Sequence, residues 1–488
     1  MTSTSHSLPL QNHSINYRSL LICFFIGALL WFYPRPPTLM LEDKAWHILT
    51  IFITTILGLI IKPLPMGGTA LIAMVIALLT KTITLDMALS GFANETVWLV
   101  VFALFIASGF STTGLGKRIA YYFTALLGKS SLGLAYGMLM TDLILSPAIP
   151  SVTGRIGGIV FPILKGIATS YQSLPFSPSS RKIGAFLTVV SFQGCAITSS
   201  LFLTAMAANP ILQMMTNTQA VENQWAMPEI TWGIWALATV VPGLFSLILM
   251  PLFVYWIYPP EIKHTPNAPL VAHEQLQILG KIKSCEWIML GTIILLLLLW
   301  IFGKSLGLSA VLSAMIGVSI LLLTRVVDWK TLVKIDEAWE TFIWFCVLMM
   351  FAKTMLEYGV INWVSQVIKL QFGTLPWTTA YPLLALIYFY SHYFFASSTA
   401  HILSMYGSFL TISVALGTPP MLAALTLIFI SNLYGGLTHY SFAPAPLLYS
   451  AGYVDIKDWW KTGFLVSLLN IAIWGSIGLA WWKFLGFW

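Results

Sequence analysis

Long apolar stretches, separated by short polar segments, recur along the 488-residue chain. A helix crosses a bilayer with about 20 predominantly apolar residues. Short segments that alternate apolar and polar residues do not recur, which argues against a membrane β-barrel. We therefore predict an all-α polytopic membrane protein with about 11 transmembrane helices. The predicted spans are residues 19–33, 46–62, 67–80, 95–113, 183–205, 230–257, 286–303, 306–324, 340–356, 420–436 and 463–485.

Two regions, residues 129–170 and 373–418, interrupt this pattern with Gly, Pro, Ser and Thr. Neither region has the pattern of a single span. The topology stays consistent when each region enters and leaves the membrane on the same side, so we predict two re-entrant hairpins. Such segments are tolerated where they are buried in protein or line a cavity. A polar segment, residues 259–285, divides the chain near its middle, and we predict that it is a cytoplasmic linker.

Composition and charge distribution support the same class. The chain is 58% hydrophobic and only 8% charged, whereas a soluble domain carries about 25% charged residues. With a cytoplasmic N-terminus, most Lys and Arg residues fall in cytoplasmic loops, as the positive-inside rule requires. The formal net charge of +7 therefore reflects topology and not nucleic-acid binding. The 4 Cys residues stand singly, so we expect neither a disulfide framework nor a zinc site.

Similar residues recur at nearly one spacing in the two halves of the chain. The motifs "ETVW" and "ETFIW", two glycines and two Ser-x-Thr triplets match in the same order, 245 or 246 residues apart. In the predicted topology the matched spans run in opposite directions, which indicates an inverted-topology repeat. Many secondary transporters bind substrate where such repeats meet. The alternative is that the small residues only allow close helix packing. The matched positions are Glu95 with Glu340, Gly114 with Gly359, and residues 151–153 with 397–399.

The two triplets form the centre of a candidate substrate site. A hairpin tip exposes unpaired N–H groups and a positive helix-dipole end, and neighbouring hydroxyls add neutral donors. Such a tip can hold a carboxylate without a permanent cation, so two facing tips fit a dicarboxylate. The same oxygens suit Na⁺ as an alternative ligand, near Ser151, Ser397 and Ser398. The predicted substrate-binding residues are Ser151, Thr153, Asn209, Ser397, Ser398, Thr399, Thr438 and Pro444.

Two further breaks follow the hairpins, at residues 198–210 and 435–446, where Pro210 and Pro444 interrupt apolar runs. Both resemble unwound helix middles, in which backbone carbonyls become available to a ligand. The alternative is a proline kink that serves packing alone.

Ionisable residues at membrane depth are functional candidates by default. Arg155 either attracts an anion or extends to the cytoplasmic surface. Asp142 is expected to hydrogen-bond between the arms of the first hairpin, with ion coupling as the alternative, and His392 to make a structural hydrogen bond. Lys353 and Glu357 have the i,i+4 spacing of a structural pair. Secondary candidates for the site are Arg155, Thr204, His401 and His439, the two histidines for a substrate or proton role.

At these residues the sequence resembles the divalent anion:sodium symporter family over nearly the whole chain. The motifs are most similar to its branch of 2-oxoglutarate/malate translocators and citrate/succinate exchangers. They are "ETVWLVVFALFIASGFSTTGLGKRIA", "PSVTGRIGGIVFPILK", "SSLFLTAMAANP", "FFASSTAH" and "LTHY…YSAGY". The resemblance implies a homodimer, in which each protomer has a scaffold and a transport domain that moves like an elevator. The corresponding division is a polar tail (1–18), scaffold helices (19–128), the first hairpin with transport helices (129–258), the linker (259–285), scaffold helices (286–372) and the second hairpin with transport helices (373–488).

The hairpin tips depart from the family pattern. Members of the family carry Ser-Asn-Thr at both tips, where these residues contact carboxylates and Na⁺. Here residues 151–153 are Ser-Val-Thr and residues 397–399 are Ser-Ser-Thr, whereas Asn209 matches the family. Val152 and Ser398 thus remove two amide groups that could bind Na⁺ or a carboxylate. This loss favours anion exchange over Na⁺ symport.

We therefore expect a secondary active transporter of dicarboxylates, of the 2-oxoglutarate/malate exchange type, in the inner or plasma membrane. The alternative is a Na⁺-coupled symporter of di- or tricarboxylates. An anion channel is a further alternative, which the inverted repeat disfavours. The chain carries no metalloprotease, hydrolase or P-loop signature, so we expect no enzyme and no cofactor other than Na⁺ as a coupling ion. Dicarboxylates and citrate share the same anchoring groups, so the sequence does not distinguish them.

Overall fold

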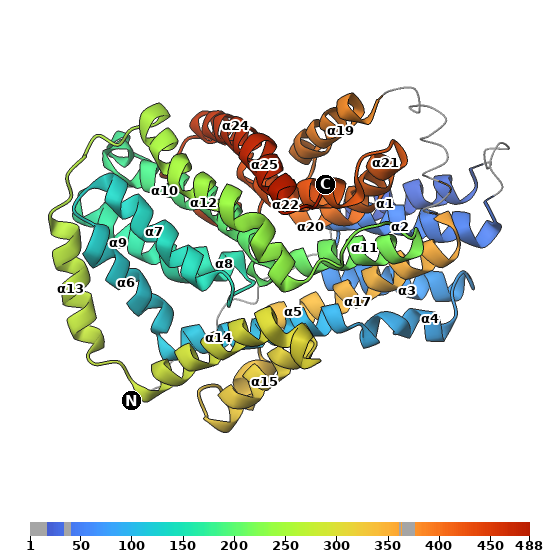
Figure 1. The fold of residues 1–488 in the computed structure, drawn as a ribbon, viewed down its shortest axis with the longest axis horizontal. Coiled ribbons are helices and arrows are strands. Elements are labelled where there is room, and N and C mark those ends of the chain that lie inside the picture. Colours follow the sequence, from blue (N-terminus) through green and yellow to red (C-terminus); the bar gives the residue numbers. More distant parts are fainter. Residues whose placement is uncertain (1–16, 34–40, 361–362, 364–375) are drawn as a thin grey trace. The chain divides into compact units, whose positions relative to one another are not determined.

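The structure is a computed structural model, which describes residues 17–33, 41–360, 363 and 376–488 (Figure 1). Within these residues the secondary structure is helical, and its β-structure is one isolated bridge between Ser130 and His264. The predicted all-α class is confirmed. Most of the predicted polar tail, residues 1–18, lies outside the described residues.

Eight described helical segments are long and apolar enough to cross a membrane. They are Asp43–Ile61, Glu95–Thr113, Val152–Ser170, Gly184–Leu201, Trp232–Ile257, Ser284–Phe302, Asp336–Glu357 and Ile456–Phe484. Shorter apolar helices cover Tyr17–Trp31, Met66–Leu79, Ser131–Leu145, Ala310–Leu323 and Pro420–Gly436. Every predicted span coincides with one of these segments, and the chain is a multi-pass integral membrane protein.

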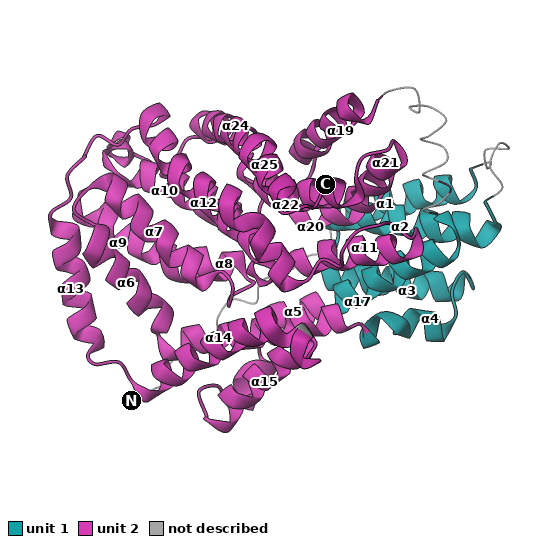
Figure 2. Ribbon diagram, viewed as in Figure 1, with its two compact units in different colours: residues 1–93, 343–360 teal, residues 94–342, 361–488 magenta. Residues whose placement is uncertain are grey.

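The described chain packs as two compact units, residues 1–93 with 343–360 and residues 94–342 with 361–488 (Figure 2). This division concerns packing within one chain and does not test the predicted scaffold and transport domains, which stay a prediction. The first unit contains α1 (Tyr17–Trp31), α2 (Asp43–Ile61), α3 (Met66–Leu79), α4 (Leu85–Ser90), the 3-10 turn Gly91–Ala93 and the later part of α17 (Asp336–Glu357).

Aromatic and polar contacts hold the first unit together. The rings of Phe52 on α2 and Phe351 on α17 lie 6.3 Å apart between centroids. The predicted pair on α17 is confirmed, since Lys353 Nζ lies 3.9 Å from Glu357 Oε1. Both of these side chains are exposed, and an exposed pair of this kind contributes less than about 1 kcal/mol to stability.

The second unit contains both predicted hairpins and both predicted breaks. Its first helices are α5 (Glu95–Thr113), α6 (Leu115–Leu127), α7 (Ser131–Leu145), α8 (Val152–Arg155), α9 (Phe161–Ser170), α10 (Gly184–Leu201) and α11 (Asn209–Glu222). They are followed by α12 (Trp232–Ile257), α13 (Asn267–Leu279), α14 (Ser284–Phe302), α15 (Ala310–Leu323) and α16 (Trp329–Val333). The last are α19 (Trp377–Ser391), α20 (Ser398–His401), α21 (Gly407–Ala415), α22 (Pro420–Leu433), α23 (Ala445–Ser450), α24 (Ile456–Ile473) and α25 (Leu479–Phe484).

The predicted linker, residues 259–285, contains a helix that the hydropathy pattern does not show. Helix α13 lies inside it and packs against α6. Arg118 of α6 holds the end of the linker, because its Nε lies 2.6 Å from Glu286 Oε2 and its Nη1 donates to the Gly280 carbonyl at 2.9 Å. A short helix with one apolar face lacks the long apolar run that predicts a span.

The repeat of the sequence recurs in the helix boundaries. Helices α7 and α19 begin and end 246 residues apart, and so do α8 and α20. A π-helical turn follows each of the short helices at the same offset, at Ile156–Val160 and Ile402–Tyr406. Gly114 and Gly359 follow α5 and α17 with φ of 78° and 73°, a left-handed conformation that glycine adopts without strain. The inverted relation between the halves stays a prediction.

The first hairpin turns at prolines. Helix α7 ends at Leu145, and Pro147 and Pro150 cannot continue it because they lack an N–H donor and clash with the preceding turn. Ser151 then caps α8, with its Oγ accepting from the Gly154 N–H at 3.1 Å, the usual arrangement at a helix start. The arm from α7 packs back against the π-helical turn that follows α8.

The second hairpin turns without a proline at its tip. Helix α19 passes into a 3-10 turn, His392–Phe394, and Ser397 then caps α20 by accepting from the Ala400 N–H at 3.4 Å. The arms α19 and α21 pack against each other. Both broken regions of the sequence are therefore helix–tip–helix hairpins.

Both predicted breaks are also present. Between α10 and α11 the backbone is extended at Phe202 and Met206, on either side of a short 3-10 turn. After α22 come a 3-10 turn, Tyr434–Gly436, and an irregular stretch that ends at Pro444, the residue before α23. Helix α10 is buried along its whole length, so the first break extends from the interior of the second unit.

Candidate functional site

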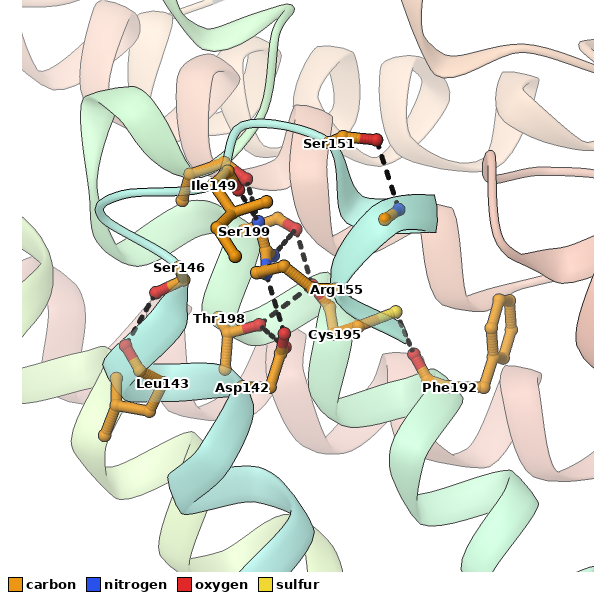
Figure 3. A network of polar contacts seen from close by, with 12 residues as sticks. Asp142, Leu143, Ser146, Ile149, Ser151, Arg155, Phe192, Cys195, Thr198 and Ser199 are labelled. Atoms are coloured by element: carbon orange, nitrogen blue, oxygen red, sulfur yellow. Dashed lines mark hydrogen bonds and ion pairs between the residues drawn. The ribbon is translucent and has the colours of Figure 1, made fainter. Parts of the chain in front are cut away.

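A buried ion pair fastens the first hairpin. Arg155, the last residue of α8, is fully buried, and its Nε lies 2.7 Å from Asp142 Oδ1 on α7. Its Nη1 donates to the carbonyl of Ile149 in the tip (Figure 3). The same Nη1 donates to the carbonyl of Ala205 in the first break. Its Nη2 donates to the Ser199 hydroxyl on α10 at 3.3 Å. One guanidinium thus joins both hairpin arms, the tip and the first break.

The structure confirms the prediction for Asp142 and contradicts one of the two alternatives for Arg155. Asp142 links the two arms of the hairpin, as predicted, and its second oxygen accepts from the Thr198 hydroxyl. The alternative that Arg155 extends to the cytoplasmic surface is wrong for this conformation, because the buried carboxylate holds the guanidinium inside. A buried charge has to be paired in this way, since an isolated one is very costly. Arg155 is a positioning residue here, and attraction of a substrate anion stays a prediction.

Two hydrogen-bonded histidines take the corresponding place in the second hairpin. His401 stands 246 residues after Arg155, and its Nδ1 lies 3.1 Å from His392 Nδ1. His392 Nε2 lies 2.8 Å from the Ser441 carbonyl, which can only accept, so this nitrogen carries a proton. With neutral rings, His392 Nδ1 then accepts from His401 Nδ1–H. His401 Nε2 lies 3.0 Å from Ser391 Oγ, whose single proton is shared with the Tyr388 carbonyl at 2.8 Å.

Aromatic rings enclose the two histidines, which are both fully buried. Tyr388 and Phe395 stack on His401 with ring centroids 4.7 and 4.5 Å away. Tyr434 stacks on His392 at 3.8 Å. The structural hydrogen bond predicted for His392 is confirmed. A substrate or proton role for His401 stays a prediction.

The threonines of the two triplets have available hydroxyls. Thr153 and Thr399 are half-buried, and neither hydroxyl has a hydrogen-bond partner within the part of the chain that the structure describes. Each is the second residue of its short helix, α8 or α20, beside the N–H groups of the first turn. The two hairpins thus present the same donor at the same place.

The serines of the triplets already have protein partners. The Ser151 hydroxyl donates to Glu337 Oε1 at 2.8 Å. The Ser398 hydroxyl donates to the Ser441 carbonyl at 3.0 Å, which ties the second tip to the second break. Ser397 Oγ caps α20. Contact of these serines with a substrate stays a prediction.

Two asparagines join the two breaks. The Asn209 amide donates to the carbonyls of Ser199 at 2.8 Å and Phe202 at 3.0 Å, and its Oδ1 accepts from Asn432 Nδ2 at 3.0 Å. Both asparagines are fully buried. Substrate binding by Asn209 stays a prediction, and in this conformation its amide nitrogen and oxygen are engaged within the protein.

The second break also holds Thr438 and Pro444, which are both buried. Thr438 Oγ1 has no hydrogen-bond partner among the described residues. Pro444 is the N-terminal cap residue of α23. An unpaired buried hydroxyl is costly, so Thr438 is a candidate for contact with a ligand.

The remaining secondary candidates lie in different surroundings. Thr204 donates to the Pro147 carbonyl at 2.6 Å, which packs the first break against the first tip. His439 is half-buried and accepts from the Trp460 indole at 3.2 Å. Its ring also lies 4.6 Å from that of Tyr449 and 5.0 Å from that of Tyr440, so its described partners are aromatic residues.

Oxygen atoms of the second break suit a Na⁺ ion better than those of the first tip. Asn432 Oδ1 and Thr438 Oγ1 are both buried without a hydrogen-bond partner among the described residues, and hard cations prefer oxygen ligands. At the first tip Val152 is buried and supplies no side-chain oxygen, and Ser151 is bound to Glu337. A Na⁺ ion near Ser151, Ser397 and Ser398 stays a prediction, and Asn432 of α22 and Thr438 of the second break offer further unpaired oxygens.

Sequence reasoning missed two of these residues. Asn432 lies within a predicted apolar span, where one polar residue gives little signal. Glu337 stands beside Asp336 in the first turn of α17, before the predicted span 340–356, and acidic residues are typical of an ordinary helix start. Each contact joins segments far apart along the chain, and the Ser151–Glu337 bond spans 186 residues.

The chain is similar to a large group of known transporters. Residues 14–488 match the sodium:sulfate symporter transmembrane region. YflS of Bacillus subtilis, provisionally named a malate transporter, is 48% identical over 469 residues, 96% of each chain. Dicarboxylate transporter 1 of Spinacia oleracea chloroplasts is 46% identical, over 98% of this chain and 83% of that protein. The inner membrane protein YbhI of Escherichia coli is 36% identical, over 96% of this chain and 98% of that protein.

Two solved structures have a similar fold. MtrF of Neisseria gonorrhoeae matches with a TM-score of 0.53, over 95% of this chain and 94% of that chain. The YdaH transporter of Alcanivorax borkumensis matches with a TM-score of 0.52, over 96% of each chain. Sequence identity is 14% in both cases, so the likeness concerns the fold alone. The match over residues 14–488, together with relatives that are up to 48% identical, shows that the chain belongs to the sodium:sulfate symporter family, the divalent anion:sodium symporters that its hairpin motifs resemble.

Proposed function

We propose that the protein transports dicarboxylates by exchanging one anion for another, as a 2-oxoglutarate/malate translocator does. The observation that carries this proposal is the pair of available hydroxyls at Thr153 and Thr399. Two equivalent donors on two equivalent tips match an anion with two carboxylates, and each tip adds the N–H groups of a helix start. Relatives named as malate and dicarboxylate transporters support the same substrate class.

The composition of the tips supports exchange over Na⁺ symport. Val152 replaces a family amide and is buried, with 4% of its surface exposed. Ser398 replaces the other amide, and its hydroxyl is bound to the Ser441 carbonyl. Both tips therefore lack the amide oxygens that the family resemblance links to Na⁺.

Na⁺-coupled uptake of di- or tricarboxylates is the second candidate. The unpaired oxygens of Asn432 and Thr438 favour it, because a bound Na⁺ would satisfy an unpaired buried oxygen. One such site is compatible with carboxylate binding at the tips. Coupling would then depend on the second break alone.

Further parts of the proposal concern assembly and orientation. We infer a homodimer with a cytoplasmic N-terminus, in which the transport domain moves like an elevator against the scaffold. The bacterial relatives support a plasma-membrane location. The proposed activity is a carrier function without a catalytic step.

Counterflow into proteoliposomes of the purified protein tests these alternatives. Exchange predicts that uptake of labelled malate requires internal malate or 2-oxoglutarate and proceeds without Na⁺. Uptake into vesicles without internal dicarboxylate that stops when Na⁺ is withdrawn would contradict exchange and support symport. A panel of di- and tricarboxylates on both sides then identifies the substrates.

A further inference from the structure

A carboxylate of the protein itself is bound at the first hairpin tip. Glu337 Oε1 lies 2.8 Å from Ser151 Oγ, within the second unit. The same Oγ accepts from the Gly154 N–H at 3.1 Å, so its one proton is directed to Glu337. A serine hydroxyl has a single proton to donate, and Glu337 therefore uses the donor that Ser151 would offer to a substrate carboxylate.

The bond to Ser151 is the one side-chain interaction of Glu337 among the described residues. Its side chain is exposed, and within the described residues it has no ion-pair partner. It stands in the first turn of α17, where the helix dipole favours an acidic residue. Its neighbour Asp336 shares that position in the helix without contacting Ser151. The contact with the tip is thus specific to Glu337.

Among the residues that the structure describes, no carboxylate contacts the second tip in the corresponding way. Phe92 stands 245 residues before Glu337, at the equivalent place in the repeat. Ser397 Oγ, the counterpart of Ser151 Oγ, accepts from Ala400 N–H to cap α20. In the described structure, a carboxylate of the protein is therefore bound at the first tip and not at the second. When no substrate is bound, only the first tip is held by such a bond.

We propose that Glu337 occupies the first tip when no substrate is bound, and that a substrate carboxylate displaces it. This inference rests on the proposed exchange function and supplies a physical reason for it. Glu337 belongs to the predicted scaffold (286–372), and Ser151 to the predicted transport domain (129–258). An empty carrier has to break the Ser151–Glu337 bond in order to move, without a bond to substrate in its place. A loaded carrier has already exchanged it for a bond to the substrate.

The test compares Glu337→Gln and Glu337→Ala with Asp336→Asn in proteoliposomes. Asp336→Asn is the matched control, because it removes the same charge from the same helix turn. We expect both Glu337 variants to take up labelled malate without internal dicarboxylate about ten-fold faster than the parent protein, the factor for losing one hydrogen bond to a charged group. We also expect their KM for exchange to fall, because an internal competitor is gone. Asp336→Asn should behave as the parent protein does.

The possible outcomes separate this inference from the proposed function. Unchanged KM and unchanged net uptake in both Glu337 variants would overturn the inference and leave exchange intact. Loss of all transport in folded Glu337 variants, verified by size-exclusion chromatography, would also overturn it, because the carboxylate would then serve transport. Net uptake by the parent protein as fast as its exchange would contradict the proposed exchange function. In that case a lower KM in the Glu337 variants, but not in Asp336→Asn, would still support displacement of Glu337.

Discussion

Arg155 and His401 occupy the same position in the two hairpins, 246 residues apart. Their partners, Asp142 for Arg155 and Tyr388 for His401, also stand 246 residues apart. Asp142 accepts from a hydroxyl on α10, and Tyr388 is hydrogen-bonded to a hydroxyl on α22. In the first hairpin the position carries a buried ion pair. In the second it carries a histidine that bonds to His392 and stacks on aromatic rings.

The comparison shows that the repeat preserves where a hairpin is anchored, but not the chemistry of the anchor. Arg155 donates directly to the Ala205 carbonyl of the first break, whereas His401 is linked to the Ser441 carbonyl of the second break through His392. A charged anchor is demanding, since a buried ion that loses its partner is strongly destabilising. A neutral one loses only a hydrogen bond or a ring contact. The two halves should therefore tolerate substitution very differently.

The largest effect is expected from Arg155→Met. The variant leaves the Asp142 carboxylate buried without its cation, so we expect the free energy of unfolding to fall by about 3–5 kcal/mol. Thermal denaturation in detergent, followed by size-exclusion chromatography, measures it. The double variant Arg155→Met with Asp142→Leu removes both charges and should recover much of this loss. A double variant no more stable than the single one would contradict the conclusion that the unpaired Asp142 carboxylate causes the loss of stability.

A smaller effect is expected from His401→Phe in the second hairpin. The ring can still stack on Tyr388, but His392 Nδ1 loses its donor, which costs about 1–3 kcal/mol of stability. The same denaturation assay applies, with His439→Phe as a control at a half-buried histidine outside the pair. Destabilisation as large as that of Arg155→Met would remove the distinction between the two anchors.

The variants Thr153→Ala and Thr399→Ala test whether the two hairpins contribute equally to substrate binding. Each variant removes a hydroxyl that we assign to one substrate carboxylate, so kcat/KM for exchange should fall about ten-fold in both. Stability should change by no more than about 0.5 kcal/mol, because neither hydroxyl has a described partner. Thr→Ser at each position, which keeps the hydroxyl, should retain most of the activity. Full activity of both alanine variants would discard the site.

The smallest effect is expected from Val152→Asn and Ser398→Asn, which introduce the amides common in the family. One added oxygen ligand contributes about 0.5–1.5 kcal/mol, so Na⁺ should stimulate transport by at most about ten-fold. Transport at graded Na⁺ concentrations measures this stimulation, with K⁺ as the control. The effect should be larger at Ser398, because Ser398 contacts the second break, which holds the unpaired oxygen of Thr438. Equal stimulation at both tips would argue against that placement of the ion.

Local patterns in the sequence were sufficient for the helices, the two hairpins and the two breaks. Hydropathy predicts a span because a bilayer requires a continuous apolar helix, and prolines end helices wherever they stand. The repeat offset predicted which positions are equivalent, and the boundaries of α7 and α19 have that offset. The pattern was insufficient for α13, because an amphipathic helix of 13 residues carries no long apolar run.

The sequence by itself determined which residues reach the tips, since the Ser-x-Thr triplets and their neighbouring helix starts are local features. Only the tertiary structure decided what those residues bind. Arg155 is directed to Asp142, Ser151 to Glu337 and Asn209 to Asn432 by the packing of helices that are distant along the chain. A polar group buried in a membrane protein needs a partner, and the hydropathy of its own segment shows that need without showing which partner meets it.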